Sequence, residues 1–299
     1  MPDTHQPLVS PEWLAQHLHD PDLAILDVRL VAGADWRAAF EAGHIPGATF
    51  TDYARDGWRA AKGMAVGMLP DAAALSALFG RLGLAPDRHA VVVPTGVNTG
   101  DFSAAARVYW TLKVVGHRRL SLLDGGWEGW RADPGRPIET GPGKPPPQTR
   151  YAAKIDERLR ADIERVEKAV TERSATLLDA RGIGYFEGRE KSPQAMRAGR
   201  LPGAVHLDQA QAYDASRRGL KPAGELERIF SAVPKGEVVS FCNTGQAAAT
   251  NWFVLAELLG RPDVRLYDGS MSSGPRMRSA RSRPGRQSRT GAKTQSPSS

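Results

Sequence analysis

The chain has 299 residues, and its 40 Lys and Arg residues outnumber its 33 Asp and Glu residues, which gives a formal net charge of +7. At about 150 residues per domain this length predicts two domains, and a hydrophobic share of 41% excludes a disordered chain. No window approaches the roughly 18 consecutive apolar residues of a membrane-spanning helix, and the first residues lack the pattern of a secretory signal. We therefore expect a globular, cytoplasmic protein that does not enter a membrane.

Short apolar or β-branched runs alternate with helical stretches along the chain. In chain order, the predicted elements are helix 72–82, strand 90–93, helix 104–115, strand 120–123, helix 163–171, strand 237–241, helix 248–259 and strand 264–267. Strands that are separated by helices need crossover connections, which favour a mainly parallel sheet flanked by helices. The sequence therefore predicts an α/β fold.

Four short motifs occur in the first half of the chain and recur in the same order in the second half. They are LDVR at 26–29, AGHIPGA at 42–48, VVVPTG at 91–96 and LLDGG at 122–126, and then LDAR at 178–181, AGRLPGA at 198–204, VVSFCNTG at 238–245 and LYDGS at 266–270. Such a repeated order indicates a duplicated unit. We expect two copies of one α/β unit, in which the aspartates that both copies share belong mostly to the scaffold.

A stretch rich in proline separates the two copies. Residues 132–150 contain six prolines and three glycines. Because proline lacks an amide donor and fixes its own φ, this stretch is expected to be an extended linker without regular structure. The predicted domains are therefore residues 1–131 and 151–271.

The end of the chain differs in composition from both domains. Residues 272–299 contain six Arg, one Lys and no acidic residue, and they lack apolar periodicity, so they are predicted to be a disordered basic tail. This tail accounts for the whole net charge, so nucleic-acid binding by the two domains is not expected. Either the tail is a basic arm for nucleic acid or an acidic partner, or the proper end of the domain has been replaced, for instance by a shifted reading frame. We favour the second explanation, because Gly274 stands where the first copy has Trp130.

Cys242 is the only cysteine, which excludes an intramolecular disulfide. It lies between a predicted strand that ends at Phe241 and a predicted helix, and ligands of open α/β sheets lie at such strand ends. Amides at the start of a helix favour an anion there, and the thiolate is the nucleophilic form of cysteine. Gly245 would let the loop curve with a positive φ. The alternative is a buried structural cysteine, but the first copy has Thr95 at the paired position, so the fold does not require sulfur there.

The duplicated LDxR, GHIPGA-like and DGG or DGS motifs, with a cysteine loop in the second copy, resemble the tandem-domain rhodanese family of sulfurtransferases over about residues 8–271. The resemblance implies that Cys242 takes sulfane sulfur from a donor such as thiosulfate, holds it as a persulfide and passes it to a thiophilic acceptor such as cyanide. It implies no metal and no organic cofactor. It also implies a catalytically silent first domain that packs against the second to form the cleft.

The loop after the cysteine departs from the patterns of the family. Members that use thiosulfate carry Cys-Arg-Lys-Gly and members that use mercaptopyruvate carry Cys-Gly-Ser/Thr-Gly, whereas this chain has Cys-Asn-Thr-Gly. The family also tends to have an arginine four residues after the arginine of LDxR, where this chain has Tyr185. Arg181 itself is expected to pair with a carboxylate, with a direct substrate role as the alternative. Nearby cations that would replace the missing charge are Arg189, Lys191, Arg197 and Arg200.

The sequence thus predicts two tandem rhodanese-like domains of the α/β class, with Cys242 as the catalytic residue. The predicted substrate-binding residues are Asn243, Thr244, Gly245, Gln246, Ala247, Arg181 and Tyr185. The leading hypothesis is a sulfurtransferase that uses thiosulfate, a small anionic donor, and a thiophilic acceptor. The alternatives are mercaptopyruvate as donor, which Thr244 favours, and a non-catalytic module that relays sulfur or binds a partner. A phosphatase is disfavoured, because Ala248 stands where related phosphatases have the arginine that clamps phosphate; the oligomeric state does not follow from the sequence.

Overall fold

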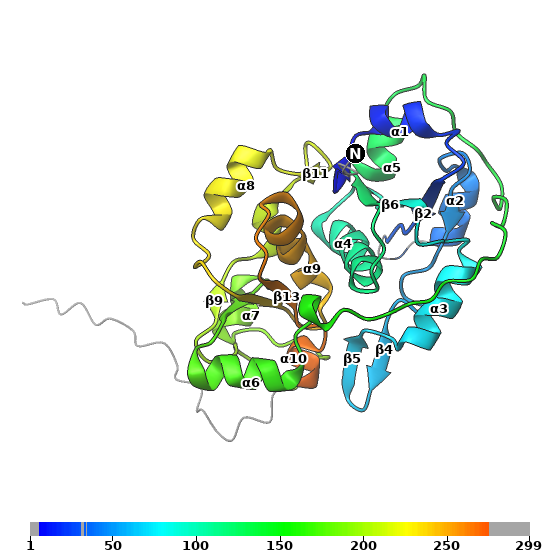
Figure 1. Cartoon of the computed structure of the whole chain (residues 1–299). Helices are drawn as coiled ribbons and strands as arrows, with labels where there is room; N and C mark the ends of the chain where they lie inside the picture. The colour runs from blue at the N-terminus through cyan, green and yellow to red at the C-terminus, as the bar shows by residue number, and fades with distance from the viewer. Residues whose placement is uncertain (1–5, 31–32, 34, 275–299) are drawn as a thin grey trace, which may run out of the picture.

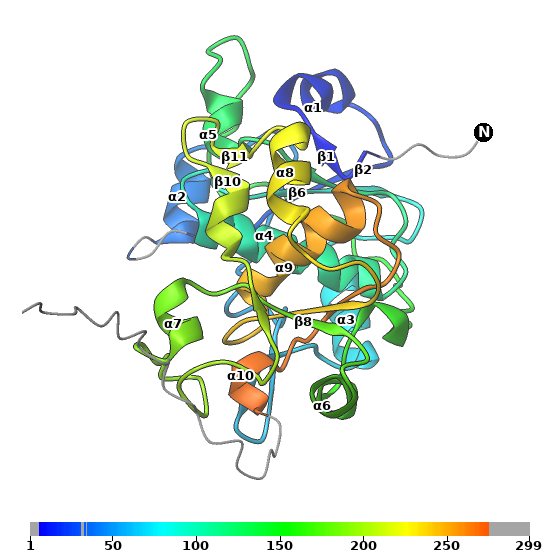
Figure 2. The same ribbon diagram turned by 90° about the vertical axis from the view of Figure 1, so that its left-hand side faces the viewer.

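The computed structural model describes residues 6–30, 33 and 35–274, and in this part of the chain two parallel sheets form the centres of two domains (Figures 1 and 2). The tail prediction for residues 275–299 lies outside the described residues. Among the described helices, none combines the length and the apolar character that crossing a membrane would require.

The first domain is built on a five-stranded sheet in the order β1-β7-β6-β2-β3, and each neighbouring pair in it is parallel. Its sheet strands are β1 (Leu8–Val9), β2 (Leu23–Asp27), β3 (Thr49–Phe50), β6 (His89–Val93) and β7 (Leu120–Leu123). A separate antiparallel hairpin consists of β4 (Ala60–Lys62) and β5 (Ala65–Met68). The helices are α1 (Pro11–His17), α2 (Trp36–Ala42), α3 (Ala72–Arg81), α4 (Thr99–Val114) and α5 (Gly126–Arg131).

Helices cover both faces of this sheet, which explains the continuous apolar runs in β2 and β6. Ile25 and Val91 belong to a core cluster on one face, while Leu26 and Val92 belong to the cluster on the other. A strand that is buried on both faces reads as a continuous apolar run rather than as an alternating one. The continuous apolar run at 90–93 predicts a buried strand because of this relation, and it lies in β6.

The second domain repeats the topology with a four-stranded parallel sheet in the order β13-β12-β8-β9. This order matches β7-β6-β2-β3 of the first domain, so the predicted duplication and the α/β fold class are confirmed. The sheet strands are β8 (Thr176–Asp179), β9 (Val205–His206), β12 (Val238–Phe241) and β13 (Val264–Leu266), and a hairpin consists of β10 (Tyr213–Asp214) and β11 (Gly219–Leu220). The helices are α6 (Ile163–Glu172), α7 (Ile183–Glu187), α8 (Ala223–Phe230), α9 (Gln246–Phe253) and α10 (Ser270–Ser273), with short 3-10 helices at Glu157–Leu159 and Gln209–Ala212.

Two helices differ from their predicted bounds by more than one residue. The helix predicted for 104–115 begins at Thr99, because Oδ1 of Asn98 accepts hydrogen bonds from the amides of Gly100 at 2.9 Å and Asp101 at 3.0 Å. Such a side-chain cap satisfies amides that the first turn leaves without partners. The helix predicted for 248–259 begins earlier, as α9, and continues after Phe253 as a π-helix over Val254–Leu258.

Helices α4 and α9 join the two domains and lie side by side between the sheets in both views (Figures 1 and 2). Almost every residue of α4 is buried, as expected of a helix that contacts protein on all sides. The hydroxyls of Ser103 and Thr250 lie 2.9 Å apart across this contact. At the far end of α4, Lys113 forms an ion pair of 2.9 Å with Glu257 of the second domain. The resemblance had implied such packing of the first domain against the second.

The segment between the domains follows the surface of the first domain. Residues 132–150 contain no helix, and their one strand-like contact is an isolated bridge between His44 and Glu139. Near the end of this segment, the amide of Thr149 donates to the carbonyl oxygen of Gly80 at 3.1 Å. The linker is therefore extended but held to the domain at both ends.

The second domain continues beyond the predicted boundary at residue 271. Helix α10 includes Ser272, which is buried and donates from Oγ to the carbonyl oxygen of Val66 in the first domain at 2.9 Å. Residues 272–274 thus belong to the folded domain and not to the tail, because this hydroxyl joins α10 to β5.

The place of Trp130 is not filled by an aromatic ring in the second domain. Trp130 is fully buried in the first domain, and its Nε1 donates to the carbonyl oxygen of Pro137 at 3.0 Å. At the equivalent position, Gly274 lines a hollow of about 610 Å³ together with Met196 and Tyr267. The second domain therefore lacks one of the buried rings that its duplicate has.

We expect Gly274→Trp to exceed Gly274→Ala in free energy of unfolding by about 1–2 kcal/mol, because the indole would bury apolar surface in this hollow. Both substitutions meet the same positive φ of +33° and the same sulfur of Met196, which lies 3.0 Å from a Cβ placed there. The comparison therefore isolates the ring. Urea unfolding of the two variants measures the difference, and equal stabilities would show that the hollow does not accept the ring.

Candidate active site at the Cys242 loop

Cys242 begins the loop between β12 and α9, at the carboxyl end of the parallel sheet. The residue is 3% exposed, and its Sγ accepts a hydrogen bond from the amide of Gly245 at 3.1 Å. Gly245 has a φ of +79°, and a Cβ there would lie 2.4 Å from Nη1 of Arg107 and 2.7 Å from the carbonyl oxygen of Asp268. Glycine is thus required for the turn that aims this amide at the sulfur.

Ser270 holds the backbone of Cys242 from the loop after β13. Its Oγ accepts a hydrogen bond from the amide of Cys242 at 3.0 Å and donates to the carbonyl oxygen of Tyr267 at 2.8 Å. Its φ of +47° lies in the left-handed region, where the equivalent residue of the first domain is Gly126. Backbone strain of this kind is concentrated at functional sites. Sequence reasoning missed Ser270, although the change from DGG to DGS between the two copies was an available signal.

A pocket of about 260 Å³ lies over the cysteine between the two domains. Its lining includes these predicted residues: Cys242, Asn243, Thr244, Gln246, Ala247, Arg181 and Tyr185. The first domain contributes Gly100 and Ser103 of α4. The structure thus brings the cysteine together with all the predicted substrate residues except Gly245. This glycine does not line the pocket, but its amide donates to Sγ of Cys242. Lining residues that the sequence analysis did not single out are Ala180, Gly182, Gln194, Asp208 and Gln209.

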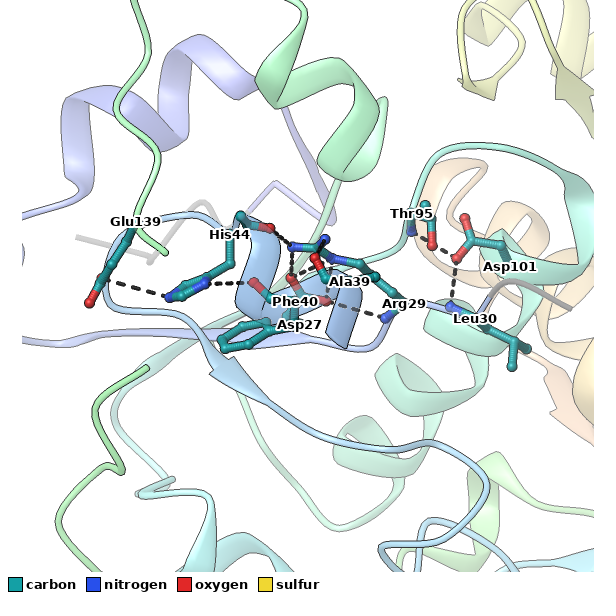
Figure 3. Close-up of polar contacts among 10 residues, drawn as sticks. Asp27, Arg29, Leu30, Ala39, Phe40, His44, Thr95, Asp101 and Glu139 are labelled. Atoms are coloured by element: carbon teal, nitrogen blue, oxygen red, sulfur yellow. Dashed lines mark hydrogen bonds and ion pairs between the residues drawn. The ribbon is translucent and has the colours of Figure 1, made fainter. Parts of the chain in front are cut away.

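Arg181 combines the predicted local ion pair with a contact to the cysteine loop. Its Nη2 lies 2.6 Å from Oδ2 of Asp179, and both side chains are almost fully buried. Its Nη1 donates to Oδ1 of Asn243 at 3.3 Å. The first domain has the same ion pair, with 2.8 Å between Arg29 and Asp27 (Figure 3). The pair belongs to the scaffold of both domains, and in the second it also orients the side chain of Asn243.

The four cations considered as replacements for the missing arginine do not line this pocket. Arg189 forms an exposed ion pair of 2.7 Å with Glu187. Arg200 lies over the ring of Phe186, 4.4 Å from its centroid. Tyr185, by contrast, lines the pocket. Within the described residues, no group of three or more His, Cys, Asp or Glu side chains is arranged to hold a metal ion.

The hydrogen-bond register shows that pairing Thr95 with Cys242 is wrong by one residue. The amide of Trp127 donates to the carbonyl oxygen of Pro94 at 2.9 Å, and the amide of Met271 donates to that of Cys242 at 3.1 Å. Trp127 and Met271 both stand three residues after the aspartate of the DGG or DGS motif. Pro94 is therefore the equivalent of Cys242. The shift arises because the loop of the first domain is one residue longer.

The loop of the first domain is occupied by a carboxylate of the chain itself. Asp101 accepts hydrogen bonds from the amides of Thr95 at 2.7 Å and Leu30 at 3.3 Å (Figure 3). It also accepts one from the amide of Gly96 at 2.7 Å. Burial raises the pKa of Asp101, and the bonds from Thr95 and Gly96 act in the opposite direction. The amides of this loop therefore form a small anion site that is already filled.

The cysteine loop has the same amides without the carboxylate. Asp101 is the third residue of α4, and the third residue of α9 is Ala248. Because Pro94 is equivalent to Cys242, the amides of Asn243 and Thr244 are equivalent to those of Thr95 and Gly96, which bind Asp101. Among the described residues, no acceptor is recorded for these two amides. The second domain thus keeps an anion site beside Cys242 that its own side chains leave open.

Residues 10–133 and 162–274 both match the rhodanese-like domain family. The chain therefore belongs to the rhodanese family and carries the domain twice. It is 30% identical to thiosulfate sulfurtransferase of Cricetulus griseus over 90% of this chain and 91% of that protein. It is 32% identical to sulfur carrier protein TtuD of Thermus thermophilus over 88% of this chain and 91% of that protein.

Among solved structures, the fold resembles the 3-mercaptopyruvate sulfurtransferase SseA from Escherichia coli. The TM-score is 0.76 at 27% identity, and the similarity covers 89% of this chain and 98% of SseA. These comparisons confirm the resemblance to the rhodanese family that the sequence motifs indicated. They also confirm the enzyme class that the resemblance implied, that of the sulfurtransferases. The protein is a sulfurtransferase of the tandem-domain type.

Proposed function

We propose that the protein transfers sulfane sulfur from thiosulfate to a thiophilic acceptor such as cyanide, through a persulfide on Cys242. The observation that carries this proposal is the amide of Gly245, 3.1 Å from Sγ, at the base of a pocket between the domains. A backbone amide that points at sulfur stabilises negative charge there, and the thiolate is the form that attacks. We expect this reaction to take place in the cytoplasm.

In the first step, the thiolate of Cys242 attacks the outer sulfur of thiosulfate. A bond forms between Sγ and this sulfur, the S–S bond of thiosulfate breaks, and sulfite leaves with the bonding electron pair. Cys242 then carries a persulfide anion, so the total charge is unchanged. The open amides of Asn243 and Thr244 are available to the charge of the donor and then to that of the persulfide.

In the second step, cyanide attacks the outer sulfur of the persulfide. Thiocyanate leaves, and the electron pair of the broken S–S bond returns to Cys242 as the thiolate. The chain has no second cysteine that would discharge the persulfide internally. We therefore expect two-step kinetics with a covalent intermediate and an external acceptor.

Mercaptopyruvate is the alternative donor, because Thr244 lines the pocket and no cation follows the cysteine in the loop. In that reaction the C–S bond breaks, and its electron pair leaves on the enolate of pyruvate, which then takes a proton. A relay role, in which another protein accepts the sulfur, is the second alternative. The sulfur carrier protein of Thermus thermophilus and the tyrosine at position 185 motivate it.

Intact-mass measurement tests these proposals directly. After incubation with thiosulfate we expect the protein to gain the mass of one sulfur atom, and we expect cyanide to remove it. Cys242→Ser should gain none, because a hydroxyl in this pocket forms no persulfide. A parallel incubation with mercaptopyruvate compares the two donors. If neither donor adds sulfur to the unmodified protein, both enzyme proposals are wrong.

A further inference from the structure

Helices α4 and α9 contact each other through equivalent residues. Ser103 and Thr250 are the fifth residues of their helices, and their hydroxyls lie 2.9 Å apart. The two helices are therefore related by an approximate two-fold axis at this contact, as in a symmetric dimer interface. In each helix, the residues that follow this contact run toward the loop that precedes the other helix. Arg107, four residues after Ser103, reaches the cysteine loop in this way, and its equivalent in the second domain is Val254.

Arg107 is a fully buried guanidinium against the loop of Cys242. Its Nη1 lies against Gly245, because a Cβ placed on this glycine would be only 2.4 Å from that nitrogen. Its Nη2 donates to the carbonyl oxygen of Gly67 at 2.9 Å. The ring of Trp110 lies 4.6 Å away on one side. In the described part of the chain, Nε and Nη1 have no hydrogen-bond partner, and no carboxylate lies within ion-pair distance of this side chain.

The charges around Arg107 leave it without a full counter-charge. Asp268 is the carboxylate nearby, but it forms an ion pair of 3.1 Å with Arg160 and accepts the amide of Leu69. Arg59 adds a second positive charge, over the ring of Tyr53 at 4.9 Å. A buried charge without a partner is costly, so this arrangement favours an anion next to it.

The sulfur of Cys242 is one of the groups whose negative charge would interact with Arg107. Burial lowers the pKa of Arg107, while the charges of Tyr53, Asp268 and Cys242 raise it. On the pocket side of the sulfur, Arg181 is already neutralised by Asp179.

We propose that Arg107, a residue of the first domain, is a positioning residue that stabilises the negative charge on the sulfur of Cys242 through the Gly245 turn. The same charge then supports the persulfide, a part of the proposal that rests on the proposed function. The asymmetry between the copies agrees with this role. The first loop has a built-in carboxylate, Asp101, whereas the second has Ala248 at that position and receives a cation from the opposite helix.

The test uses the full chain with Arg107→Met, which removes the charge and keeps an apolar side chain of similar length. The readout is the rate of Cys242 alkylation by iodoacetamide as a function of pH, because the thiolate is the reacting form. We expect the profile of Arg107→Met to move by about one pH unit or more toward high pH, and persulfide formation at neutral pH to slow by about tenfold. The shift should persist in about 1 M salt, which screens charges on the surface.

Arg107→Lys keeps the charge and should restore most of the profile, whereas Arg107→Gln, which keeps a donor for Gly67, should behave like Arg107→Met. Arg55→Met, an exposed arginine of the same domain, is the matched control and should leave the profile unchanged. The two neutral variants are Arg107→Met and Arg107→Gln. If a folded protein of either kind has an unchanged alkylation profile, the proposal is wrong. Alkylation needs no sulfur donor, so this result stands even if the unmodified protein forms no persulfide and the proposed function fails.

Discussion

Replacement of Ala248 by aspartate is expected to slow persulfide formation on Cys242 strongly in a protein that still folds. At the equivalent position of the first domain, Asp101 accepts the amides of its loop and fills their anion site. A carboxylate at position 248 would accept the amides of Asn243 and Thr244 in the same way and would repel an anionic donor. Because loss of one such amide donor typically costs about 10²–10³ in rate, we expect persulfide formation from thiosulfate to slow by at least about a hundredfold.

The time course of the intact mass with thiosulfate measures this effect, and circular dichroism checks that the variant is folded. Ala248→Asn is the matched control, because it has nearly the same size and no charge. It should retain at least about tenfold more activity than Ala248→Asp, since a neutral amide neither repels the donor nor accepts hydrogen bonds as strongly as a carboxylate. Persulfide formation at the unmodified rate in Ala248→Asp would show that these amides do not bind the sulfur anion.

The fold and the position of the nucleophile were predictable because both are encoded in local patterns. The repeated motifs revealed the duplication, and the alternation of strands and helices required a parallel sheet. The strand before Cys242 and the glycine after it then located the loop at the carboxyl end of that sheet. That Arg181 pairs with a nearby carboxylate was predictable for the same reason, because the LDxR motif occurs in both copies; the structure identifies the partner as Asp179.

The residues that surround the sulfur from other elements were not predictable in this way. Arg107 lies in a helix of the other domain, and its sequence neighbours show only that the helix is buried. The equivalence of Pro94 and Cys242 was hidden, because a one-residue difference in loop length is visible only in the register of the sheet. The roles of Ser270 and Ala248 follow from their equivalents in the first domain, Gly126 and Asp101, and from the hydrogen bonds at these positions.

Removal of the carboxylate of Asp179 is expected to cost the most stability of any single substitution considered, about 3–5 kcal/mol. The side chains of Asp179 and Arg181 are 0% and 3% exposed, and 2.6 Å separates their charged atoms. Asp179→Ala would leave the guanidinium of Arg181 buried without its counter-charge. Because Arg181 also holds Asn243, we expect the cysteine loop to lose an anchor and persulfide formation to slow as well.

Urea unfolding measures the loss, and Glu187→Ala is the control. The pair of Glu187 and Arg189 has a similar separation of 2.7 Å, but its side chains are 48% and 62% exposed. Exposed pairs contribute about 0–1 kcal/mol, because water and salt screen them. In the double variant Asp179→Ala with Arg181→Met, we expect part of the loss to be recovered, since no buried charge remains. If Asp179→Ala were no less stable than Glu187→Ala, the buried ion pair would not be what stabilises this end of the second sheet. Arg181 would then be held in place beside Asn243 by its hydrogen bond to the carbonyl oxygen of Gly199.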